Sequence, residues 1–107
     1  MKVLITATAP ELSANVDERF GRAAYFIIAS TDKDGFESIE NESANAPSGA
    51  GIAAAQKVIE INPDIVITGN CGPKAEQLLT AANIKIQTGV KGTVENAIKS
   101  AKTVCDK

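Results

Sequence analysis

The feature that most constrains the fold of this chain is a strand–glycine turn–helix pattern that occurs twice. Residues 64–68 lead into a glycine turn at 69–72, residues 84–88 lead into a second one at 89–92, and a helical pattern follows each turn. A strand that feeds a glycine turn and then a helix aims backbone N–H groups and the positive end of the helix dipole at one place. The pattern therefore predicts an α/β protein with two places that suit an anion.

Hydrophobic patterning along the chain predicts five strands and three helices in the order β-β-β-α-β-α-β-α. The expected strands are residues 3–7, 25–30, 36–42, 64–68 and 84–88, and the expected helices are one that Ser48 caps and that reaches Asn62, one at 73–82, and one that Thr93 caps. The first three strands are joined too tightly for crossovers, so the second strand should run antiparallel to its neighbours. The last two strands follow helices and should be parallel through right-handed crossovers. We predict a three-layer α/β fold with a five-stranded mixed sheet in the order 3-2-1-4-5.

Length and charge limit the classes of function. The 107 residues fit a single domain over residues 1–107, and a hydrophobic content of 44% is typical of a folded globular protein. A net charge of −2 lacks the basic character that a general nucleic-acid binder needs. No apolar run approaches the roughly 20 residues that span a bilayer, and the start of the chain resembles a strand more than a signal peptide. We therefore expect a cytoplasmic protein with neither nucleic acid nor membrane as a partner.

The chain contains no histidine. This absence removes Ser-His-Asp and Cys-His catalysis, imidazole acid–base chemistry and His-ligated zinc. The remaining residues favour binding over catalysis, and we predict that the protein is not an enzyme.

The predicted topology brings four loops to one edge of the sheet, at residues 8–23, 43–51, 69–72 and 89–92. Ligands of open α/β sheets bind beyond the carboxyl ends of the strands, where the chain leaves neighbouring strands in opposite directions. Each glycine alone also fits an ordinary tight turn, and Arg19 also fits an ion pair with Asp17 or Glu18. The candidate binding residues at this edge are Arg19, Arg22, Gly69, Asn70, Gly72, Lys91, Gly92 and Thr93.

The two cysteines lie in unlike settings. Cys71 stands in a turn just before a helix N-terminus, where a thiolate is favoured and exposed, so we predict it as a metal ligand; an incidental thiol stays an open alternative. Cys105 lies on the same helical face as Val94 and is expected to be a small buried hydrophobic residue.

Several segments resemble the dinitrogenase iron–molybdenum cofactor biosynthesis family, in the same order along nearly the whole chain. They are residues 17–23 with Tyr25-Phe26, residues 49–52, residues 67–73, and Gly89 with residues 92–94. The resemblance implies a ribonuclease H-like fold and a nitrogenase accessory factor-like role, as a carrier or scaffold for an anionic metal–sulfur cluster of the iron–molybdenum or molybdenum–copper type. It also implies cluster donor or acceptor proteins as partners, and we expect a monomer or weak homodimer. Some members use histidine at the cluster, and this chain has none, which favours a thiolate-anchored or purely electrostatic mode.

Residues and resemblance together predict how the cluster would be held. The N–H groups that follow Gly72 and Gly92 would contact it, Arg19, Arg22 and Lys91 would neutralise its charge, and Cys71 could add a soft ligand. One thiol cannot fill the shell of a four-iron cluster, so the cluster must bring its own sulfides, share ligands with a second chain or stay labile.

The sequence also bears on three other classes of function. A small phosphorylated ligand would use the same helix ends, although the chain has no Gly-x-x-x-x-Gly-Lys-Ser/Thr motif. A regulatory interaction domain without a cofactor is a further alternative. A ribonuclease H-like nuclease is disfavoured, because the central strands 3–7 and 65–68 carry no carboxylate for metal ions.

Overall fold

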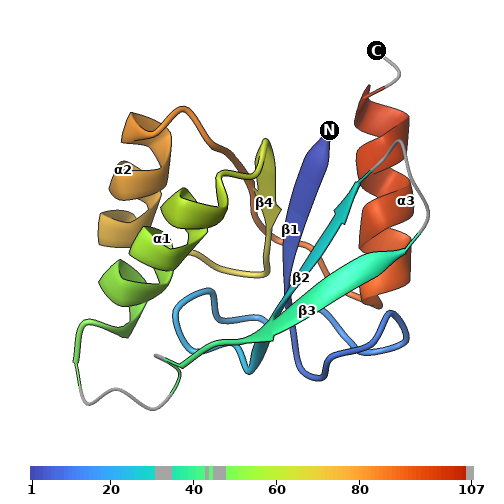
Figure 1. Ribbon diagram of the computed structural model, residues 1–107, viewed down its shortest axis with the longest axis horizontal. Coiled ribbons are helices and arrows are strands. Elements are labelled where there is room, and N and C mark those ends of the chain that lie inside the picture. The colour runs from blue at the N-terminus through green and yellow to red at the C-terminus, as the bar shows by residue number, and fades with distance from the viewer. Residues whose placement is uncertain (31–34, 43, 45–47, 106–107) are drawn as a thin grey trace.

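A computed structural model describes the backbone of residues 1–30, 35–42, 44 and 48–105, and the side chains as far as residue 101 (Figure 1). The strands are β1 (Lys2–Ala7), β2 (Tyr25–Ser30), β3 (Phe36–Glu40), β4 (Ile65–Ile67) and β5 (Lys85–Gln87), and the helices are α1 (Ala50–Ile61), α2 (Pro73–Ala81) and α3 (Val94–Cys105). Five strands form one sheet in the order β3-β2-β1-β4-β5. β2 runs antiparallel to β1 and β3, whereas β1, β4 and β5 are parallel. This topology confirms the predicted fold.

The helices cover the two faces of the sheet unequally. In Figure 1, α1 and α2 lie on one face and α3 on the other. Leu4 and Val66 face α1 and α2, while Ile5 and Ile67 face α3, because successive side chains of a strand point to opposite faces. β1 and β4 are therefore buried on both faces, which explains why their sequences are continuous apolar runs. Each such side chain contributes about 1.5–3 kcal/mol through burial.

The helix ends differ in part from the sequence prediction. Ser48 does not cap α1, because the N-cap is Gly49, which has φ 72° and offers no side-chain acceptor. The prediction for α3 is confirmed, since the Asn96 N–H donates to the Thr93 Oγ1 at 3.2 Å. The side chain of Cys105 lies outside the described residues.

β3 is shorter than expected and ends at Glu40. Its chain continues into Asn41, whose backbone N–H donates to the Ala24 carbonyl oxygen (3.0 Å) and whose side chain is buried. The inward turn places the Asn41 side chain beneath the loop that contains residues 21 and 23, at the carboxyl edge of the sheet. Within the described part of the chain, no helix has both the length and the apolar character needed to cross a membrane.

Candidate anion-binding cleft

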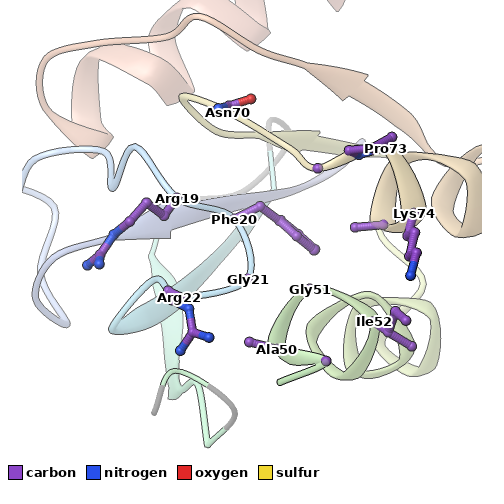
Figure 2. Close-up of a pocket in the computed structure, with 13 residues that line it drawn as sticks. Arg19, Phe20, Gly21, Arg22, Ala50, Gly51, Ile52, Asn70, Pro73 and Lys74 are labelled. Atoms are coloured by element: carbon purple, nitrogen blue, oxygen red, sulfur yellow. The ribbon is translucent and has the colours of Figure 1, made fainter. Parts of the chain in front are cut away.

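A cleft of about 590 Å³ opens at the carboxyl edge of the sheet (Figure 2). It lies between residues 19–22, which we call the arginine loop, and the first turns of α1 and α2. These three segments follow β1, β3 and β4, so the topology itself assembles the cleft where ligands of such sheets bind. The lining residues are Arg19, Phe20, Gly21, Arg22, Gly49, Ala50, Gly51, Ile52, Asn70, Gly72, Pro73, Lys74 and Ala75.

Buried polar side chains hold the arginine loop in place. The Asp17 carboxylate accepts the backbone N–H groups of Arg19 (3.0 Å) and Ala24 (3.4 Å). The Asn41 amide donates to the carbonyl oxygens of Gly21 (3.0 Å) and Ala23 (2.9 Å). Asp17 and Asn41 are each only 6% exposed, so water does not reach these positions. The two side chains therefore supply the hydrogen bonds that the buried backbone groups of the loop need.

Phe20 anchors the same loop in the core. Its ring is 1% exposed and lies 6.1 Å from the ring of Phe26, measured between centroids. The expectation that Phe20 belongs to the core is confirmed, although part of it also borders the cleft. The loop therefore has a fixed hydrophobic base, while its two arginines are exposed.

Two glycines let the arginine loop and the residue before it, Glu18, lie directly against their neighbours. A Cβ on Gly69 would lie 2.7 Å from the Glu18 Cα, and a Cβ on Gly21 would lie 2.6 Å from the Gly51 Cα. The Phe20 N–H donates to the Asn70 carbonyl oxygen (3.0 Å), which joins the loop to the turn after β4. Gly69 therefore packs closely behind the cleft and does not line it, and its assignment as a binding residue stays a prediction.

Two helix N-termini border the cleft. The N-cap residues are Gly49 for α1 and Gly72 for α2, and neither makes a side-chain capping bond. The first N–H groups of a helix have no acceptor within the helix, and the helix end carries about half a positive charge. Pro73 has no N–H, so the donors of α2 begin at Lys74.

Three basic side chains add to this positive character. The Arg19 Nε lies 3.6 Å from the Asp17 Oδ1, so Arg19 makes one of the two ion pairs that its sequence setting allowed, yet its side chain is 68% exposed. The Arg22 Nη1 donates to the Ala44 carbonyl oxygen at 3.1 Å. Each guanidinium has five N–H donors, so each can hold these partners and still reach a ligand. Lys74 is exposed at the opposite side of the cleft (Figure 2), and among the described lining residues none is acidic.

Cys71 does not have the setting predicted for it. Its side chain is 7% exposed, belongs to the core cluster with Phe20 and Ala75, and does not line the cleft. Burial, and next the Glu76 carboxylate, raise the pKa of the Cys71 thiol from its ordinary 9.0 to about 11. The prediction of an exposed, favoured thiolate was wrong, because desolvation outweighs the helix end. Its role as a metal ligand stays a prediction.

The second glycine turn lies apart from the cleft. The Gly92 carbonyl oxygen accepts the Val16 N–H at 2.8 Å, and Thr93 caps α3. Lys91 is exposed, and none of Lys91, Gly92 and Thr93 lines the cleft. The structure thus brings Arg19, Arg22, Asn70 and Gly72 together and leaves these three outside, so their assignment as binding residues stays a prediction.

Sequence reasoning missed two parts of the cleft. Lys74 follows Pro73, the first residue of α2. A basic residue in the first turn of a predicted helix was the sequence feature that could have identified it as a cleft residue. The loop at residues 43–51 was predicted at this edge of the sheet, but no residue of the first turn of α1 was named as a binding residue.

A family model described as dinitrogenase iron-molybdenum cofactor matches residues 1–104. The chain belongs to this family. The apo form of the orange protein from Desulfovibrio gigas is similar in structure, with a TM-score of 0.91 and 36% identity over 96% of this chain and 88% of the other. A putative NifB protein from Thermotoga has a TM-score of 0.79 and 32% identity over 95% and 87% of the two chains. No curated protein sequence is significantly similar to the chain.

Membership of the dinitrogenase iron-molybdenum cofactor family confirms the resemblance seen in the sequence. It relates the chain to the binding or carriage of the iron–molybdenum cofactor.

Proposed function

We propose that the cleft carries an anionic metal–sulfur cluster as cargo, held by charge and by backbone N–H groups. One observation carries the proposal: two helix N-termini without side-chain caps and three basic side chains border a single cleft, and no described lining residue is acidic. Backbone N–H groups at helix ends and arginine guanidinium groups are the donors that proteins use for anions.

The strength of these contacts suits a carrier. A hydrogen bond to a charged group contributes about 1.5–3 kcal/mol, and a helix end about 0.3–1 kcal/mol. Three such bonds with two helix ends amount to about 8 kcal/mol before the cost of association, which is itself about 4 kcal/mol or more, so the net affinity is moderate. Binding of this strength retains the cargo in transit and still releases it to an acceptor.

The lining also favours sulfide over oxygen at the surface of the anion. Ala50, Ile52, Pro73 and Ala75 present apolar surface, and Asn70 is the only uncharged polar side chain among the described lining residues. Phosphate is strongly hydrated and gains little from apolar surface, whereas soft sulfides are larger and less strongly hydrated. This contrast places a metal–sulfur anion ahead of a small phosphorylated ligand.

The proposal requires no metal ligand from the protein. Among the described residues, no three His, Cys, Asp or Glu side chains come close enough to hold a metal ion, and Cys71 is covered. A cluster that brings its own sulfides, such as a thiomolybdate or a molybdenum–copper or iron–molybdenum sulfide, fits these residues. The cluster would come from a donor protein and pass to an acceptor, and the protein would act as a carrier rather than as an enzyme.

The test is anaerobic titration with tetrathiomolybdate, with and without copper(I), followed by visible absorption after desalting. We expect Arg22→Ala to raise the Kd about tenfold and the double variant Arg22→Ala with Lys74→Ala about a hundredfold. Lys85→Ala is the matched control. Lys85 begins β5 at the opposite edge of the sheet, and its substitution removes one positive charge, as Arg22→Ala does.

Three results would count against the proposal. Binding that is unchanged in the double variant would place the cargo elsewhere. Equal competition by inorganic phosphate or sugar phosphates would favour the phosphorylated-ligand alternative. Retention of colour by Cys71→Ala would support the electrostatic mode, and complete loss of colour in a folded variant would be a third result against the proposal, because it would indicate a thiolate anchor.

A further inference from the structure

Gly51 lies in the cleft although the fold does not require a glycine there. It is the second residue of α1 and lies at the cleft wall shown in Figure 2. It is not among the residues with positive φ, and a Cβ built on it would meet only the Ala75 Cβ, at 3.8 Å. That distance is an ordinary van der Waals contact. Alanine is also a better helix former than glycine, so local structure alone favours a side chain at this position.

Gly21 provides the contrast. Its Cβ would lie 2.6 Å from the Gly51 Cα and 2.7 Å from the Gly51 N, so the arginine loop can lie on α1 only if residue 21 has no side chain. Gly21 thus serves the fold. A Cβ on Gly51 would point away from that contact, toward Ala75 of α2.

The place that a Gly51 side chain would fill is the junction of the two helix N-termini. Ala75 belongs to the first turn of α2, and Gly51 to the first turn of α1. An anion that contacts the N–H groups of both turns must lie over this pair of residues. A side chain on residue 51 would hold the anion away from the α1 donors.

We infer that Gly51 is a specificity-determining position: the missing side chain lets the cargo place one face against both helix N-termini at once. The inference rests on the proposed function, since it concerns the same cleft. It adds that the space between Gly51 and Ala75 limits the size of the surface that the two helix N-termini offer, so that the cluster is recognised by a compact anionic face.

The test is a series at one position, Gly51→Ala and Gly51→Leu, titrated with tetrathiomolybdate. Gly51→Ala should raise the Kd about threefold to tenfold, and Gly51→Leu at least about tenfold. The melting temperature of Gly51→Ala should stay unchanged or rise by a few degrees, because a Cβ fits at this position and alanine suits a helix. Ala81→Leu is the control, because Ala81 is exposed at the far end of α2 and outside the cleft, and its Kd should change less than about twofold.

Three other outcomes would contradict the inference or the proposed function. Wild-type affinity in Gly51→Leu, while Arg22→Ala weakens binding, would overturn the inference and leave the proposed function standing. A marked drop in the melting temperature of Gly51→Ala would also overturn it, because the glycine would then serve the fold. Absence of tetrathiomolybdate binding by the wild-type protein would overturn both.

Discussion

The amide of Asn41 should decide both the stability of the protein and the shape of its cleft. In Asn41→Ala the carbonyl oxygens of Gly21 and Ala23 each lose a donor that now lies within 3.0 Å. The side chain is 6% exposed, so water does not readily replace it. A lost hydrogen bond amounts to about 1 kcal/mol, and an unsatisfied buried carbonyl adds a further penalty. We therefore expect a loss of about 2–4 kcal/mol in the free energy of unfolding.

Urea unfolding followed by circular dichroism measures this loss. For a domain of this size, 1 kcal/mol shifts the melting temperature by about 4–8 °C, so the variant should melt at least about 8 °C lower. Asn96→Ala is the control, because Asn96 is exposed on α3 and should change stability by less than about 0.5 kcal/mol.

Binding gives an independent readout of the same substitution. At a temperature where Asn41→Ala is fully folded, the arginine loop should be less firmly held, and the Kd for tetrathiomolybdate should rise. A loss of less than about 1 kcal/mol would refute the reasoning about the two hydrogen bonds. A large loss of stability with wild-type affinity would refute the link between Asn41 and the cleft.

Two further predictions concern the core and the loop contact. Burial raises the pKa of the Cys71 thiol to about 11 in the folded protein, against 9.0 when the chain is unfolded. Between these two pH values the unfolded state loses its proton more readily than the folded state, so the wild-type protein should lose about 2–3 kcal/mol of stability as pH rises through this window. Cys71→Ala should lack that part of the pH dependence in urea unfolding, and equal slopes in both proteins would contradict the buried thiol. Gly21→Ala should lose about 1–3 kcal/mol through overpacking, whereas Gly72→Ala, whose Cβ meets no atom within 4 Å, should melt close to wild type. Equal thermal unfolding of these two variants would contradict the close contact between the loop and α1.

The fold was predictable because its signals are local and repeated. The continuous apolar runs of β1 and β4 identify strands buried on both faces, and the helix that follows each of the last glycine turns shows the helical period. Pro73 and Thr93 mark helix starts that the structure confirms. Strand order then follows from short connections and right-handed crossovers.

The cleft was predictable only in part, because it depends on contacts between distant segments. Arg19 and Asn70 are 51 positions apart in the sequence and form an isolated bridge in the structure. The inward turn of Cys71 depends on its position between two exposed residues, Asn70 and Gly72, and propensity does not fix which way such a residue points. The separation of Lys91 from the cleft depends on the pairing of its turn with residues 15–16.

In the proposed complex the anion lies between the arginine loop and the first turns of α1 and α2. Amide chemical shifts of the ¹⁵N-labelled protein, followed during titration with tetrathiomolybdate, test this placement most directly. We predict the largest shifts at Gly51, Ile52, Lys74 and Ala75. Shifts confined to Lys91, Gly92 and Thr93 would contradict the claim and place the anion at the second glycine turn.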